Sequence, residues 1–166
     1  NLLDDNLYVH LLEGLKITLL VSIVSLILSF ILGLILAIIK KAKLDLNPKW
    51  DNPKGFALNL LDKLVGLFIT IIRGTPSTIQ LLIMFNVILV GLDNLVIIAI
   101  ATFTLNSAAY MSEVIRSGLN SVSKGEVEAA RSLGLSYKQA LFKISLPQAL
   151  RNALPALGNE VITLLK

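Results

Sequence analysis

The amino-acid sequence predicts an all-α protein, a polytopic bundle of membrane-spanning helices. Of its 166 residues, 55% are hydrophobic and 16% are charged, whereas soluble domains have about 45–50% apolar and about 25% charged residues. The apolar residues form blocks long enough to cross a bilayer. Lysine and arginine collect between these blocks, where they orient a membrane protein.

Four apolar blocks are the expected spans, at residues 15–39, 64–92, 95–115 and 147–165. At about 1.5 Å rise per residue, the first block is long enough for a hydrocarbon core of about 30 Å. In the second, Pro76 lacks an amide proton and predicts a kink. Small side chains share one face of the first block and predict a close contact with another helix: Thr18, Ser22, Ser25, Ser29 and Gly33.

Basic residues predict the topology. One group lies in the polar connection 40–63 and another between residues 116 and 151, whereas none lies in 1–14 or 86–94. Three helices of alternating direction place both groups on the same side, and the excess of positive charge makes that side cytoplasmic. We therefore expect the N-terminus outside the cell. We attribute the net charge of +4 to this topology and not to nucleic-acid binding.

The cytoplasmic segment 116–146 is predicted to carry two short helices. Two capping-box patterns and a glycine stop punctuate it: Ser123 with Glu126, Gly134, and Ser136 with Gln139. Ala129 and Ala130 leave a low surface on the first helix, against which the backbone of a partner can pack. An amphipathic helix lying on lipid is the alternative, but it needs a broader apolar face than this segment offers.

This segment resembles the EAA loop of permease subunits in ATP-binding-cassette (ABC) importers. The matching anchors keep the spacing of that family: Glu128, Ala129, Ala130, Gly134, Ile144, Ser145, Leu146 and Pro147. The resemblance implies a coupling helix, formed around Glu128, Ala129, Ala130 and Gly134, that docks on the ATPase subunit. ATP-driven closure of the ATPase pair would then reach the membrane helices.

Three further stretches resemble the polar amino acid uptake branch of the same family. They are residues 73–76 with Gln80, residues 106–110 with Glu113 and Arg116, and residues 146–151 leading to 157–160. The resemblance implies the type I importer fold, with four helices in this chain and a fifth in the complete protein. Residues 1–166 would then be a single permease domain, truncated at its C-terminus.

The same resemblance implies the cellular setting. It places the chain in the bacterial cytoplasmic membrane, with a polar amino acid as cargo and alternating access as mechanism. The implied partners are an ABC ATPase, a second permease subunit in a homo- or heterodimer, and the lipid bilayer. An extracytoplasmic amino acid-binding protein, or a binding domain fused upstream, would deliver the cargo.

The sequence contains no Gly-x-x-x-x-Gly-Lys-Ser/Thr loop, so we expect ATP hydrolysis on a separate chain. It contains no cysteine and a single histidine, His10. Disulfides and metal sites built from cysteine or histidine clusters are thereby excluded. We expect a transport subunit with no catalytic residue, metal or cofactor.

Polar residues inside the apolar blocks are candidates for a substrate pathway, because such residues usually face a cavity or the protein interior. The candidates are Arg73, Thr75, Asn106, Ser107, Tyr110, Glu113, Asn159 and Thr163. Hydrogen bonding between helices is the alternative role for these residues, with Glu113 paired to Arg116.

Two other classes of protein remain open. One is an ion channel or ion-coupled carrier that uses no ATPase, and the other is a structural membrane subunit that transports nothing. The docking segment argues against a channel. Polar residues lining a path between subunits would argue against a purely structural role.

Overall fold

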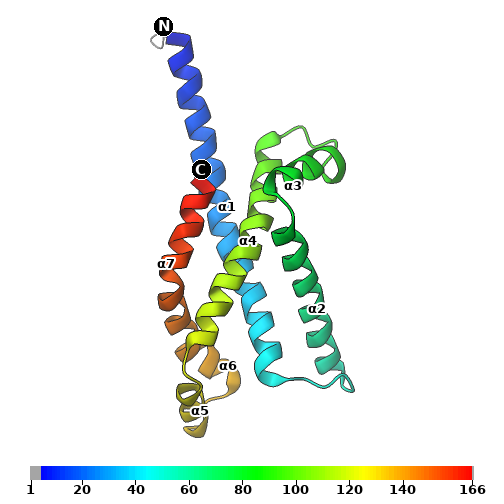
Figure 1. Ribbon diagram of the computed structural model, residues 1–166, viewed down its shortest axis with the longest axis vertical. Helices are drawn as coiled ribbons and strands as arrows, with labels where there is room; N and C mark the ends of the chain where they lie inside the picture. The colour runs from blue at the N-terminus through cyan, green and yellow to red at the C-terminus, as the bar shows by residue number, and fades with distance from the viewer. Residues whose placement is uncertain (1–4, 166) are drawn as a thin grey trace.

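The computed structural model describes residues 5–165 and shows a bundle built from helices alone over that range (Figure 1). Three long helices, α1, α2 and α4, run alternately between the two ends of the molecule, and α7 lies along α4. The elements in chain order are α1 (Asp5–Leu46), α2 (Pro53–Gly74), α3 (Ser77–Ile83), the π-helical turn η1 (Met84–Ile88), α4 (Leu95–Ser121), α5 (Lys124–Ser132), α6 (Tyr137–Ala140), the π-helical turn η2 (Leu141–Ser145) and α7 (Leu146–Leu165).

Three of these helices are long and apolar enough to cross a membrane: α1 from Tyr8, α2 and α4. The fourth expected span, 147–165, is also helical, and the 20 residues of α7 match the length of a membrane crossing. However, α7 does not belong to the apolar set, because polar residues such as Arg151, Asn152 and Glu160 interrupt it.

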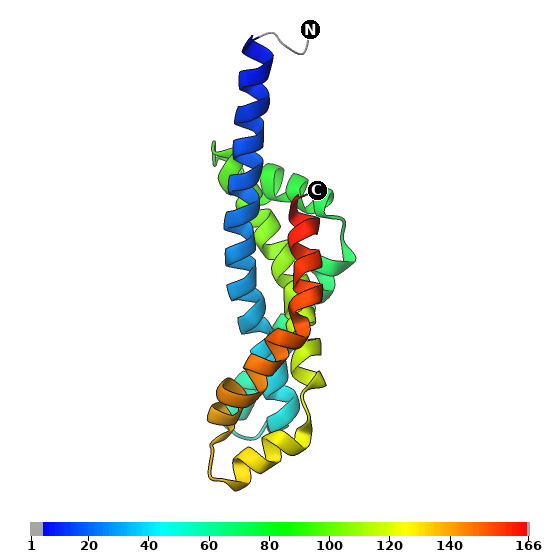
Figure 2. The ribbon, with the colours of Figure 1, turned by 90° about the vertical axis from the view of Figure 1, so that its left-hand side faces the viewer.

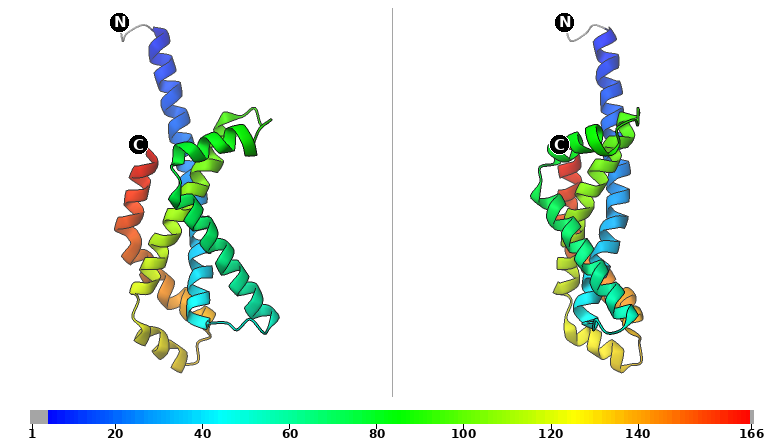
Figure 3. Two further views of the ribbon diagram at one scale, coloured as in Figure 1. Left: turned by 45° about the vertical axis from the view of Figure 1, so that its right-hand side comes forward. Right: turned by 90° about the vertical axis from the view of Figure 1, so that its right-hand side faces the viewer.

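The predicted second span, 64–92, is wrong as a single kinked helix. Helix α2 ends at Gly74, Thr75 and Pro76 are extended, and α3 turns across the end of the bundle (Figure 3). The physical reason is Pro76, which has no amide proton and also disfavours the helical conformation of the residue before it. Helix α2 therefore crosses the bundle alone, and α3 with η1 forms a short cap at the end where α4 begins.

The polar connection 40–63 is also shorter than expected. Helix α1 continues to Leu46 and α2 begins at Pro53, so only residues 47–52 are outside helices. The Asn52 side chain accepts a hydrogen bond from the amide of Gly55 at 2.8 Å, and Pro53 occupies the first turn of α2, where a missing amide proton costs nothing. The second Asn-Pro step thus starts a helix instead of extending a loop.

Helix α1 packs on α4 through small side chains, which confirms the predicted contact face from Ser22 to Gly33. Ser25 and Ser29 are fully buried. A Cβ atom added at Gly33 would lie 2.9 Å from the Cβ of Met111 and 3.1 Å from the carbonyl oxygen of Ala108. The two backbones therefore approach closely, as small residues permit in lipid. Thr18, the first residue of the predicted face, is exposed.

A second close approach joins α4 to α7 at the opposite end of the bundle from the N-terminus of α1. Gly118 lies against the backbone oxygen of Ala149. Around it a buried apolar cluster connects α1, α4, η2 and α7: Ala37, Ile115, Leu119, Val122, Leu141 and Ala149. This cluster holds the start of α7 and the short helices before it against the ends of α1 and α4 (Figure 2).

The α1–α4 contact gives a stability prediction. Replacing Gly33 with alanine should lower the free energy of unfolding by about 1–3 kcal/mol, because the new methyl group overpacks the interface with Met111. Gly14→Ala on the same helix is the matched control, since nothing lies within 4 Å of the added methyl group. Thermal unfolding in nanodiscs, followed by the fluorescence of the single tryptophan Trp50, measures both. Equal midpoints for the two variants would contradict the prediction.

Candidate functional site

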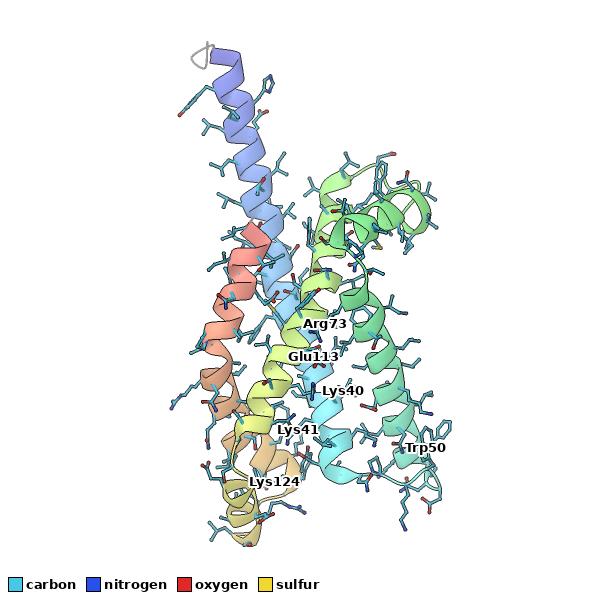
Figure 4. All side chains as sticks on the ribbon, in the orientation of Figure 1. Lys40, Lys41, Trp50, Arg73, Glu113 and Lys124 are labelled. Atoms are coloured by element: carbon cyan, nitrogen blue, oxygen red, sulfur yellow. The ribbon has the colours of Figure 1, made fainter. Side chains whose placement is uncertain are left out.

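A cluster of charged and aromatic side chains joins α2 to α4 near the middle of the molecule. Arg73 comes from the last turn of α2, and Glu113 and Arg116 lie one turn apart on α4. Both carboxylate oxygens of Glu113 accept hydrogen bonds from Arg116, and Nη1 of Arg73 lies 3.9 Å from Oε2 of Glu113. Figure 4 shows Arg73 and Glu113 facing each other between the two helices. The predicted Glu113–Arg116 pair is therefore confirmed, and Arg73 is a third member.

Tyr110 completes this cluster, which we call the Arg73 cluster: Arg73, Tyr110, Glu113 and Arg116. The Arg73 guanidinium lies over the Tyr110 ring, 5.2 Å from the ring centroid. The negative face of an aromatic ring attracts a cation at this distance. Arg73 is thus held by a ring and a carboxylate together, although 43% of its side chain is still exposed.

Two open cavities flank the Arg73 cluster. One, of about 780 Å³, lies between α1, α2 and α4, and the other, of about 530 Å³, lies between α4 and α7. Arg73, Tyr110 and Glu113 line both. The cluster therefore separates two spaces that a small polar molecule could enter.

The larger cavity has a basic lining. Its cationic side chains are Lys40, Lys41, Lys43, Arg73 and Arg116, and its carboxylates are Asp62 and Glu113. Lys40 pairs with Asp62 at 3.2 Å, and Glu113 is engaged by Arg116. With both carboxylates paired, the excess charge facing this cavity is positive, and it favours a ligand that carries a carboxylate.

Gln80 closes the break between α2 and α3. Its side-chain amide donates hydrogen bonds to the carbonyl oxygens of Ile72 at 2.7 Å and Thr75 at 3.0 Å, and to the Thr75 hydroxyl. These oxygens belong to the end of α2, where helix carbonyls have no partner in the helix. Asn106 of α4 in turn donates to Oε1 of Gln80 at 3.0 Å. Thr75 and Asn106 are therefore linked through a buried glutamine that was part of the family resemblance but was not among the pathway candidates.

The remaining pathway candidates lie elsewhere. Ser107 is 3% exposed and lines neither cavity beside the Arg73 cluster. Asn159 and Thr163 are exposed on α7, where the Thr163 hydroxyl bonds to the Asn159 carbonyl. The polar side chain that α7 brings to the smaller cavity is Asn152, which also donates to the Ser121 hydroxyl at 2.9 Å. Asn152 lies within the predicted span 147–165, and no pattern in the sequence distinguished it.

The predicted docking segment forms α5, which lies across the end of the bundle below α4 (Figure 2). Val127 and Ala130 face the protein, with Val127 packed on the apolar cluster around Leu119. Glu128 and Ala129 are exposed. The apolar side of α5 is thus already covered by its own chain, which leaves it little apolar surface for lipid.

The two predicted capping boxes have different outcomes. Ser136 and Gln139 form theirs, with the Ser136 hydroxyl accepting from the Gln139 amide and the Gln139 side chain accepting from the Ser136 amide. At Ser123 the capping box is wrong, because the side chain makes no cap bond. Glu126 turns away and accepts a hydrogen bond from Gln148 of α7 instead.

Gly134 ends α5 as predicted. Its φ of +90° is a left-handed conformation in which glycine is unstrained, and its amide bonds to the Arg131 carbonyl at 3.0 Å. The preceding residue, Leu133, is 83% exposed. The exposed residues at this end of the molecule therefore include Glu128 and Ala129 of α5 and Leu133 just after it.

The shared carboxylate of the Arg73 cluster gives a second stability prediction. Glu113→Gln should lower the free energy of unfolding by about 1–3 kcal/mol, because both arginines lose their anion. Arg73→Gln should lower the free energy of unfolding by less than about 1 kcal/mol, because Arg116 keeps its two hydrogen bonds to Glu113. Chemical unfolding in nanodiscs measures the order, with the exposed Glu13→Gln as control. A larger effect from Arg73→Gln would overturn this account of the cluster.

The family model described as "Binding-protein-dependent transport system inner membrane component" matches residues 56–166. The L-cystine transport system permease protein TcyL of Bacillus subtilis (strain 168) is 42% identical over 123 residues, which cover 69% of this chain and 52% of that protein. The arginine transport system permease protein ArtQ of the same organism is 37% identical over 163 residues, which cover 94% of this chain and 66% of that protein. The chain thus spans about half to two thirds of the length of these relatives.

Two solved transporter structures are also similar to this chain. The crystal structure of an amino acid ABC transporter with histidines matches with a TM-score of 0.76 and 32% identity, over 99% of this chain and 72% of that one. An inward-facing structure of the MetNI methionine ABC transporter has a TM-score of 0.79 at 24% identity, over 98% and 73% of the two chains, and shows the shared fold. The family match covers well over half of the sequence, so this chain belongs to the inner membrane components of binding-protein-dependent transport systems.

Proposed function

We propose that this chain is the permease subunit of an ABC importer that moves a polar amino acid into the cell by alternating access. The observation that carries the proposal is α5, a short helix at the end of the bundle whose exposed face includes Glu128 and Ala129. In a chain of this family, such a helix suits docking on a separate ATPase. The relatives named for cystine and arginine transport support an amino acid as cargo.

The proposed orientation places α5 in the cytoplasm. The connection between α1 and α2, with Lys49, and the first turn of α2, with Lys54, lie at the same end of the molecule as α5, with Lys124 (Figures 1 and 4). An excess of lysine and arginine at one end favours the cytoplasmic side. The start of α1 is at the opposite end and would lie outside. An ATPase would then reach α5 directly from the cytoplasm.

The proposed pathway passes the Arg73 cluster. Arg73 and Tyr110 line both cavities, and the side chain of Arg73 is partly free to bind a carboxylate. A second permease subunit would close the open sides of these cavities, and a binding protein or fused binding domain would deliver the amino acid from outside. ATP binding by the two ATPases would bias the equilibrium between inward-open and outward-open states.

The docking role is tested in proteoliposomes that contain the full-length subunit, its ATPase and its binding protein. Glu128→Arg and Ala129→Trp should each reduce ligand-stimulated ATP hydrolysis about tenfold or more, the effect of losing about 1.4 kcal/mol at an interface. Both residues are exposed, so the folded permease should tolerate the changes. Glu13→Arg and Ala57→Trp make the same changes at exposed positions outside α5 and should have no effect.

The outcomes separate the alternatives. If wild type hydrolyses ATP only with ligand and binding protein, and the α5 variants lose this response, both the importer function and the docking helix are supported. If the α5 variants behave like wild type, α5 is not the docking element. If wild type moves solutes without any ATPase, a channel or coupled carrier replaces the importer, and if it moves nothing, a structural subunit does.

A further inference from the structure

Polar contacts tie the segment that carries α5 to the end of α1. The hydroxyl of Tyr137, the first residue of α6, donates to Oδ2 of Asp45 at 3.1 Å. Nζ of Lys41 lies 3.0 Å from the other oxygen of Asp45 and 3.4 Å from Oδ1 of Asn120. Asp45 and Lys41 are one turn apart on α1, and Asn120 is near the end of α4. We call this chain of contacts the Tyr137 bridge: Tyr137, Asp45, Lys41 and Asn120.

The Lys41–Asp45 part of the Tyr137 bridge is more sheltered than an ordinary surface ion pair, whereas Asn120 is exposed. The Lys41 and Asp45 side chains are only 15% and 28% exposed. The Tyr137 ring packs on the apolar cluster that includes Leu119. Contacts that share members in a partly buried site reinforce one another, whereas an exposed pair contributes little. Burial and the Asp45 carboxylate raise the pKa of the Tyr137 phenol, so its hydroxyl stays protonated and remains a donor.

The bridge lies beside the proposed docking helix. One cavity of about 480 Å³ is lined by all four bridge residues and by Val127, Glu128 and Arg131 of α5. The capping box at Ser136 fixes the start of α6, one residue before Tyr137. A displacement of α5 therefore acts close to the bridge.

The chain itself connects the α5 segment only to α4 and α7. Helix α1 precedes both in sequence, and its described side chains contact this segment in the apolar cluster with Ala37 and in the bridge. An apolar contact can slide, whereas a hydrogen-bonded carboxylate and phenol have a defined direction. The bridge thus supplies a directional attachment between α1 and the docking segment.

We infer that Tyr137 and Asp45 are positioning residues that hold the docking segment on α1 and pass its displacement to that helix. The inference rests on the proposed function of α5 as the docking helix. The structural half concerns the permease alone, and the transmission half concerns the complete transporter, so the two are measured separately.

The structural half is tested by distance measurement. The sequence contains no cysteine, so Leu46→Cys and Lys138→Cys place two spin labels on exposed sites of α1 and α6. In the full-length permease in nanodiscs, pulsed electron resonance should show one narrow distance. Tyr137→Phe and Asp45→Ala should each increase the ratio of detached to attached populations about fivefold, the effect of one net hydrogen bond. Tyr8→Phe, which removes a hydroxyl from an exposed part of α1, should change nothing.

The transmission half is tested by the ATP hydrolysed per amino acid imported in proteoliposomes. Tyr137→Phe should raise this ratio about fivefold while the ATPase still co-purifies with the permease, and Tyr8→Phe should match wild type. Unchanged distances in Tyr137→Phe and Asp45→Ala overturn the bridge. Altered distances with an unchanged ratio overturn its part in transmission. A wild type without ligand-stimulated hydrolysis refutes the proposed function and with it the transmission half, whereas the distance measurement still decides whether the bridge holds α6 on α1.

Discussion

The close packing of α1 on α4 is the contact on which the other helices depend. In lipid, burying apolar surface between helices gains little, because acyl chains are as apolar as leucine. Two spans must therefore come near enough for many direct contacts, which small residues at the interface allow. Ser25, Ser29 and Gly33 are such residues, and they bring α1 against Ala108 and Met111. Helix α4 becomes the centre of the bundle, with α1 on one side and α2 and α7 on others.

This packing divides α4 into two faces with different roles. The buried face contains Ala108, Met111 and Ile115, which contact α1 and the core. The face toward α2 and α3 contains Asn106, Tyr110 and Glu113, which meet Gln80 and Arg73. The polar groups on this second face are satisfied by Arg73 of α2, Gln80 of α3 and Arg116 of α4 itself. The closely packed α1–α4 pair thus supports the polar cluster, beside the two cavities.

The sequence predicted the parts of this structure that follow from local rules. Residue spacing alone predicted the small-residue face of α1 and the glycine that ends α5. The two groups of basic residues predicted that α5 lies at the same end of the molecule as the connection between α1 and α2. Prediction from the sequence failed where another interaction competed with a local rule. Pro76 was expected to bend a helix, but Gln80 of α3 supplies the hydrogen bonds that let α2 end before Pro76. At Ser123, Glu126 found a distant partner in Gln148, and no local pattern predicts such a partner.

The difference between local patterns and contacts with distant residues also explains why the sequence did not point to Tyr137. The role inferred for Tyr137 depends on Asp45, which lies far away in the sequence. Each residue alone looks like an ordinary polar group near a helix end. What joins them is the α1–α4 packing, which brings the last turn of α1 beside the end of α4 and therefore beside the segment that follows α4. The α1–α4 contact thus also determines that the last turn of α1 lies next to the α5 segment. It thereby determines which side chains would first receive a displacement of α5.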